Sequence, residues 1–299
     1  MNTLHHDVIS SICEYAPVLA LTCKTFHQPG QLNISDYFTV EGMTWALKYG
    51  YKPTRNTFKL LVKHRAPLDV IKMIDWTFVP KDNFCADAAA EGHLYVLKWA
   101  RANGCPWDEH VCPRAAEGGH LQVLKWAREN GCPWDEHTCA LAAWAGHIEV
   151  LKWARVNGCP WDERTCELAA EEGHLEVLKW ARANGCPWYD SACDHAASNG
   201  HLQVLKWARA HGCSWNEHTC AVAARGGHLE VVKWARTNGC PWDEATCEGA
   251  AQGGHLEVLQ WAHANGCPWD ERTCEGAARM GHLEILQWAR ANGCPWDGS

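Results

Sequence analysis

The chain has 299 residues, a formal net charge of −8 and 47% hydrophobic residues. This acidic balance argues against a general phosphate-binding surface, so we expect no nucleic-acid partner. No apolar run approaches the roughly 18 residues that a membrane-spanning helix needs, so we expect no membrane partner either. The first residues do not resemble a secretory signal, and the 18 cysteines are expected to be reduced thiols of a cytoplasmic protein, or alternatively a nuclear one.

Residues 1–30 are predicted to form a short helical segment. Its apolar spacing and its ending, "LALTCKTF", resemble an F-box. In that family the segment docks on the small adaptor of a cullin-type ubiquitin ligase, while the repeats that follow select a substrate. The residues that carry the resemblance are Leu4, Val8, Ile9, Ile12, Tyr15, Leu21, Cys23 and Phe26. The alternative is a helical cap over the first repeat, because the ends of a repeat stack need a cover.

Residues 31–83 are predicted to hold degenerate copies of a repeat that becomes regular at residue 84. "GMTWALKYGYKPT" and "APLDVIKMIDWTFVPKDNF" both echo its second helix and the turn that follows. Pro53 and Pro80 in these two stretches lie 27 residues apart.

From residue 84 to residue 299 the same pattern returns every 27 residues, which predicts eight regular repeats. The Gly-His pair recurs from His93 to His282, and two columns of cysteine and two of tryptophan keep the same step. These columns hold 16 of the 18 cysteines and 16 of the 19 tryptophans. The unusual composition is therefore a property of one repeated unit.

One repeat, residues 162–188, predicts two helices. Asp162 is a good N-cap for a first helix, and Gly173 ends that helix because glycine accepts the left-handed conformation. The apolar spacing of the next stretch predicts a second helix from about Leu175 to Asn184, and Pro187 prevents its continuation. Stacked copies of such a pair bury a continuous core, so the expected fold is all-α, an open solenoid of helix-turn-helix repeats.

The repeated side chains have expected places in this core. We expect the tryptophans to fill it and to dominate stability, so that Trp180→Ala costs about 3–5 kcal/mol. The Gly-His histidine is expected to be a turn residue that hydrogen-bonds the interhelical backbone. The cysteines are expected to be buried free thiols, although the spacing leaves a Cys105–Cys112 disulfide open.

The stretch "TCELAAEEGHLEVLKWARANGCPW" resembles the ankyrin repeat through both helices and the Gly-His turn. The unit is six residues shorter than that family's usual one, and the resemblance places the deletion in the loop between repeats. Shortened repeats rich in tryptophan and cysteine also resemble those of giant DNA viruses, oomycetes and algae, which would imply the host cytoplasm for a viral protein. The resemblance implies a protein-binding solenoid.

Chemical sites are not expected. Cys112 and His120 of one repeat would lie about 12 Å apart along a helix, too far to share a zinc ion. A single active site does not need eight copies of one histidine, and no glycine-rich phosphate loop is present. We therefore expect no enzyme activity, metal or cofactor.

Positions that differ between repeats are the candidates for partner binding, because the fold does not determine them. Trp144 is foremost, since an aromatic residue at a position that is otherwise small or polar is typical of a binding anchor. The alternative is a tryptophan ring that lies flat over its own helix. Leu141 and Leu168 are expected to pack instead. The other candidates are His110, Glu117, His137, Arg164, Glu171, Glu172, Ser198, Asn199, His218, Arg225, Gln252, Arg279 and Met280.

Two functions follow from these features. The first is a substrate-recruiting adaptor of a cullin-type ubiquitin ligase, bound through residues 1–30, with an unidentified protein target on the repeats. The second is an interaction scaffold with no ligase link. The last repeat carries no polar replacement that would seal its apolar end, which predicts weak end-to-end self-association.

Overall fold

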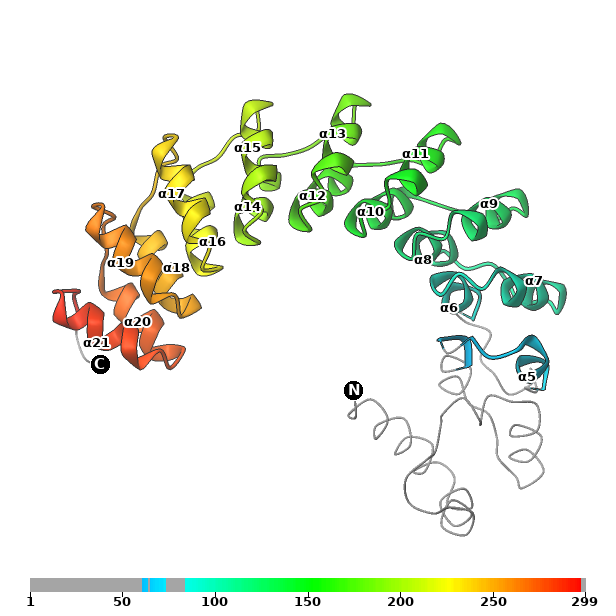
Figure 1. Ribbon diagram of the computed structural model, residues 1–299, viewed down its shortest axis with the longest axis horizontal. Coiled ribbons are helices and arrows are strands. Elements are labelled where there is room, and N and C mark those ends of the chain that lie inside the picture. The colour runs from blue at the N-terminus through cyan, green and yellow to red at the C-terminus, as the bar shows by residue number, and fades with distance from the viewer. Residues whose placement is uncertain (1–60, 64, 74–83, 297–299) are drawn as a thin grey trace, which may run out of the picture. The chain divides into compact units, whose positions relative to one another are not determined.

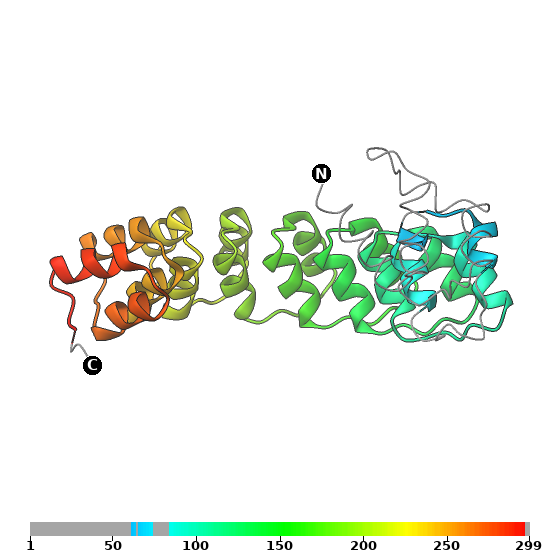
Figure 2. The same ribbon diagram turned by 90° about the horizontal axis from the view of Figure 1, so that it is seen from below.

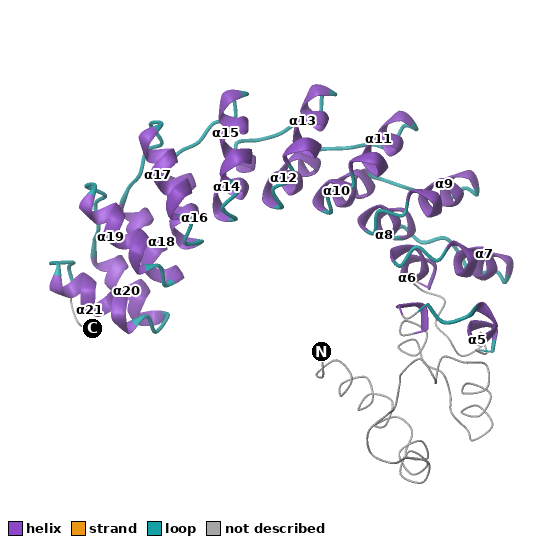
Figure 3. Cartoon of the chain, viewed as in Figure 1, coloured by secondary structure: helices purple, strands orange, loops and turns teal. Residues whose placement is uncertain are grey.

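The computed structural model describes residues 61–63, 65–73 and 84–296. All regular elements in these ranges are α-helices, which confirms the predicted all-α solenoid class (Figure 3). The chain divides into two compact units, Met1–Pro133 and Trp134–Ser299, which are described separately. The F-box-like segment 1–30 and most of residues 31–83 lie outside the described residues, so both interpretations stay predictions.

In the first unit, α5 (Leu68–Lys72) buries Val70 and Ile71. Two helix pairs follow it: α6 (Phe84–Ala90) with α7 (Leu94–Ala102), and α8 (Val111–Glu117) with α9 (Leu121–Glu129). Helix α6 packs against α8, so the first helices of the two pairs are neighbours.

The second unit repeats this arrangement. Its helices are α10 (Glu136–Trp144), α11 (Ile148–Val156), α12 (Glu163–Glu171), α13 (Leu175–Ala183), α14 (Ser191–Ser198), α15 (Leu202–Ala210), α16 (Glu217–Arg225), α17 (Leu229–Thr237), α18 (Glu244–Gly253), α19 (Leu256–Ala264), α20 (Glu271–Arg279) and α21 (Leu283–Ala291). The pairs follow one another in chain order (Figures 1 and 2). The even-numbered first helices make most of the contact between neighbouring repeats. Fully buried alanines such as Ala169 and Ala170 allow this close approach.

Most first helices begin at an acidic or amide cap. Asp135, Asn216 and Asp243 each accept the backbone N–H two residues ahead, at 3.1, 2.9 and 3.1 Å. Asp162 has the predicted extended N-cap backbone, yet its carboxylate does not make this bond. One of its oxygens accepts from the Arg164 side chain at 2.8 Å.

Within each of the two units, the Gly-His pair joins a repeat to the one before it. Gly200 has a left-handed backbone with φ of 78°, and the ring of His228, from the next repeat, lies over it. His228 Nε2 donates to the Ser198 carbonyl at 2.9 Å, and His282 donates to the Gln252 carbonyl at 3.2 Å. The expected hydrogen bond to the interhelical backbone is therefore present, and its acceptor belongs to the preceding repeat.

The core consists of small and aliphatic side chains. In the repeat formed by α12 and α13, Cys166, Leu178 and Ala181 are fully buried, whereas Trp180 is only half-buried. The expectation that the tryptophans fill the core is wrong. A helix turns by about 100° per residue. Trp180 therefore lies to one side of the face on which Leu178 and Ala181 are buried.

The tryptophans instead form a ladder that covers the core from outside. The ring of Trp180 meets Trp161 of the preceding turn edge-on, with centroids 5.9 Å apart. Arginine then covers the turn tryptophan: the Arg155 guanidinium lies 4.0 Å from the Trp161 centroid. His263 takes the arginine's place in its repeat and stacks on Trp269 at 3.8 Å. The indoles thus act as a half-exposed lid on the core.

The Gly-His junction predicts unequal costs for two Gly→Ala substitutions. A Cβ at Gly200 would lie 2.5 Å from His228, whereas a Cβ at Gly212 would meet nothing within 4 Å. Both changes strain a left-handed backbone by about 1–2 kcal/mol. Gly200→Ala should lower the free energy of unfolding in urea by about 1 kcal/mol more, because it also displaces the histidine hydrogen bond. Equal losses would contradict this role of the histidine.

The placement of the tryptophans predicts that the core leucine matters more. Leu178→Ala should cost about 2–5 kcal/mol of unfolding free energy, since Leu178 is fully buried. Trp180→Ala should cost about 2 kcal/mol, below the usual range for a buried aromatic. Urea unfolding followed by circular dichroism measures both free energies of unfolding. A larger loss for Trp180→Ala than for Leu178→Ala would indicate that the indole belongs to the core.

Candidate functional site

The first helices of the second unit carry two rows of variable side chains. The N-terminal row lies at the start of each first helix and comprises His137, Arg164, Ser191, His218, Ala245 and Arg272. The C-terminal row lies at the end of each first helix, with the residue that follows it, and comprises Trp144, Glu171, Glu172, Ser198, Asn199, Arg225, Gln252, Arg279 and Met280. The predicted partner-binding residues of this unit all fall in one of these rows.

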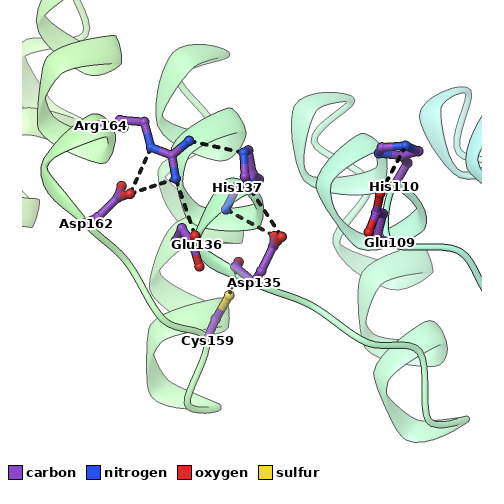
Figure 4. Close-up of polar contacts among 8 residues, drawn as sticks. All are labelled: Glu109, His110, Asp135, Glu136, His137, Cys159, Asp162 and Arg164. Atoms are coloured by element: carbon purple, nitrogen blue, oxygen red, sulfur yellow. Dashed lines mark hydrogen bonds and ion pairs between the residues drawn. The ribbon is translucent and has the colours of Figure 1, made fainter.

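Arg164 links two repeats in the N-terminal row (Figure 4). Its guanidinium pairs with Asp162 at 2.7 Å in its own repeat and with Glu136 at 3.4 Å in the preceding one. It also donates to His137 Nε2 at 3.1 Å. The hydrogen bond from Arg164 to Asp162 raises the pKa of the guanidinium, so its charge is permanent.

These contacts determine the tautomer of His137. Since Nε2 accepts from Arg164, the ring proton must lie on Nδ1. That proton points at Asp135 Oδ2, 3.1 Å away (Figure 4). His137 is exposed, so this end of the row presents an oriented imidazole beside a fixed cation.

A third, acidic set of residues was missed by the sequence analysis. Ser191 donates to Glu167, the Thr219 hydroxyl donates to Asp194 at 2.6 Å, and Arg272 lies 3.8 Å from Glu248. Each carboxylate comes directly after the first-helix cysteine and meets the start of the next first helix. These positions also vary between repeats, from proline and alanine to glutamate, so a column comparison could have found them.

The most prominent side chain of the C-terminal row is Trp144, the last residue of α10. The side chain is 37% exposed, and its indole Nε1 donates to Glu172 Oε1 of the next repeat at 3.0 Å. Glu172 is itself exposed. The hydrogen bond therefore holds a large aromatic ring at the surface beside a carboxylate.

Other members of the C-terminal row also pair across repeats. His195 Nδ1 lies 3.7 Å from Glu171, and Arg225 hydrogen-bonds the Gln252 side chain. At the far end, Met280 and Leu283 are 56% and 65% exposed. Leu141 and Leu168, expected to pack, are half-buried. The predicted self-association through this end stays a prediction.

The first unit shows the same kinds of contact on its own surface. His110 lies 3.8 Å from Glu109, and its backbone N–H donates to Asp108 at 2.9 Å. Arg114 and Glu117 form an ion pair at 2.8 Å along one helix. Exposed pairs such as these contribute little to stability, so a partner can exchange them at low cost.

The described residues contain no group of three or more side chains that could hold a metal ion. None of their helices is long and apolar enough to cross a membrane. The sixteen cysteines in these ranges are free thiols. The disulfide left open between Cys105 and Cys112 does not form, because Cys105 contacts Cys85 instead.

Comparisons with known proteins show what part of this chain is similar to. Residues 166–209 match the family model described as ankyrin repeats (many copies). Among solved structures, the ankyrin repeat domain of human ASB11 is similar at 20% identity, covering 52% of this chain and 84% of that chain with a TM-score of 0.45. A comparison with curated proteins found no match.

Proposed function

We propose that this chain, an ankyrin-repeat protein, binds a protein target through the two variable rows of its first helices. Ankyrin repeats are protein-interaction modules, and their constant residues here are used for stacking. What remains for recognition is the set of side chains that differ between repeats and reach the surface.

Trp144 is the observation that carries the proposal. It is 37% exposed, whereas its polar counterpart Glu171 occupies the same position one repeat later. Exposed aromatic anchors dominate binding energy in many interfaces because they bury a large area with few rotamers to freeze. The site of first contact is therefore placed at the C-terminal row, where α10 meets α12.

The chemistry around Trp144 favours a basic side chain of the partner. The indole N–H is already engaged by Glu172, which leaves the ring face for contact. Glu171 and Glu172 stand beside it, and Glu171 is half-buried. A lysine or arginine over the ring would gain a cation–π contact of about 1–2 kcal/mol and pair with a carboxylate.

Trp144→Ala should weaken partner binding at least tenfold, about 1.4 kcal/mol, while changing the melting temperature little. Affinity isolation with the full chain identifies the partner, and calorimetry with the purified partner measures the dissociation constant. Tyr189→Ala is the matched control, since Tyr189 is an exposed aromatic (62%) outside both rows. Its affinity should equal that of the unmodified chain. Equal binding by Trp144→Ala would place the interface elsewhere, and a large stability loss would make Trp144 structural.

The finer proposal is that the chain recruits this target to a cullin-type ubiquitin ligase, in a reducing compartment such as the cytoplasm. It rests on the F-box-like ending at Leu21, Cys23 and Phe26. The alternative, an interaction scaffold without a ligase, needs no such contact.

Co-purification separates the two. The full chain should retain the small adaptor of the ligase, and a Leu21→Ala, Phe26→Ala double variant should lose it because both apolar contacts are removed. Trp144→Ala should retain it. Failure of the unmodified chain to bind the adaptor would leave the scaffold function.

A further inference from the structure

Every regular repeat in the described ranges brings two cysteines together. One lies in the first helix and the other follows the second helix, 20 residues later. In the first such repeat the sulfurs of Cys85 and Cys105 are 3.2 Å apart and hydrogen-bonded. The corresponding pairs of the other repeats are Cys112–Cys132, Cys139–Cys159, Cys166–Cys186, Cys193–Cys213, Cys220–Cys240, Cys247–Cys267 and Cys274–Cys294, and in each pair one thiol raises the pKa of the other. Cys220 with Cys240 and Cys274 with Cys294 also share a buried cluster.

The second cysteine of a pair is held from another side as well. Cys186 Sγ donates to the Asp162 carbonyl at 3.4 Å, and Cys294 Sγ donates to the Asp270 carbonyl at 3.3 Å. In both cases the acceptor is the N-cap residue of the same repeat's first helix. A pair therefore ties together the start of the first helix, its middle and the turn after the second helix.

This geometry is close to that of a disulfide. A disulfide bond is about 2.05 Å long, so the sulfurs of Cys85 and Cys105, 3.2 Å apart, need to approach by only about 1 Å. The two cysteines belong to one repeat and are both buried. Closing the bond would fasten the first helix to the turn that follows the second.

We propose that each cysteine pair is a dithiol–disulfide modification site, that hydroperoxides oxidise it reversibly, and that Cys274–Cys294 is the first pair to close. Cys294 is 7% exposed, while the next most exposed paired cysteine, Cys267, is 4% exposed. Its partner Cys274 is fully buried beside Ala289 in one cluster. Oxidant thus reaches Cys294 first, and a resolving thiol is already in contact with it.

The reaction balances as a two-electron oxidation. The Cys294 thiolate attacks one oxygen of hydrogen peroxide, forms a sulfenic acid and releases hydroxide, which takes up the proton that Cys294 lost. The Cys274 sulfur then attacks the sulfenic sulfur, the S–O bond breaks, and the hydroxyl leaves as water with the Cys274 proton. One dithiol and one peroxide give one disulfide and two waters. Thiol reductants reverse the step.

Burial raises the pKa of Cys294 to about 12, and its hydrogen bond with Cys274 acts in the same direction. Only the thiolate is the nucleophile, so the rate of closure should rise about tenfold per pH unit between roughly pH 7 and pH 9. Closure should therefore be slow at neutral pH and need sustained exposure to the oxidant.

Peptide mapping of the full chain tests the proposal. The reduced protein is treated with hydrogen peroxide, quenched with an alkylating reagent, digested and analysed by mass spectrometry. The linked Cys274–Cys294 peptide should form first and disappear with dithiothreitol, and the Cys166–Cys186 link should need longer exposure. The oxidised protein should melt at a higher temperature than the reduced one, because the bond restricts the unfolded chain.

Two variants keep the result decisive. Cys274→Ala removes the resolving thiol, so a sulfenic acid should accumulate on Cys294, where dimedone traps it. Cys166→Ala, the matched change in an interior repeat, should leave the Cys274–Cys294 link unaffected. If Cys274→Ala loses its helical circular dichroism, Cys294→Ala replaces it and should leave Cys274 reduced. The proposal fails if Cys294 of the unmodified chain stops at an oxyacid with Cys274 still alkylated, links to another repeat, or reacts only after unfolding.

Discussion

The close approach of neighbouring first helices is the contact on which the rest of the structure depends. It requires small side chains, and each repeat supplies buried alanines and a cysteine where the helices meet. A residue with a larger side chain at Ala169 or Ala170 would force the helices apart. The separation would also break the histidine hydrogen bond that reaches back one repeat, because that bond depends on the spacing of the two helices. Packing and polar contacts therefore act on the same junction.

Because the buried alanines and the histidine hold neighbouring repeats together, the residues at the ends of the first helices can vary. The ion pairs and hydrogen bonds that cross between repeats there, such as Arg164 with Glu136, are exposed and contribute little to stability. Their role is to orient side chains: Arg164 selects the tautomer of His137, and Glu172 holds Trp144 against the neighbouring repeat. A partner meets a surface whose side chains already have few conformations to lose, which lowers the entropic cost of binding.

The two-helix architecture of a repeat could be predicted from the sequence because the same pattern of apolar, capping and turn residues recurs in every repeat. The second helix was expected from about Leu175 to Asn184 and runs from Leu175 to Ala183. Contacts across repeats were harder. The acceptor of the histidine hydrogen bond and the acidic set at Glu167 each depend on which residues two stacked repeats bring together, whereas Cys85 meets Cys105 through the packing of the two helices of one repeat. Spacing within one unit does not contain that information. Trp180 was misplaced for a different reason, since apolar character alone does not separate the edge of a helix face from its centre.

The backward reach of the histidine also bears on how such a chain can change length. Each junction uses one side from the preceding repeat, its left-handed glycine and carbonyl, and one side from the next, its imidazole. Suppose that a segment of one whole repeat length is duplicated or excised. Its imidazole then still meets a left-handed glycine and a carbonyl of the repeat before it, so every junction is restored. A segment of any other length leaves an imidazole facing the wrong backbone. Recombination between the near-identical repeats of a gene like this one would therefore yield folded proteins of many lengths, each with a new order of surface side chains.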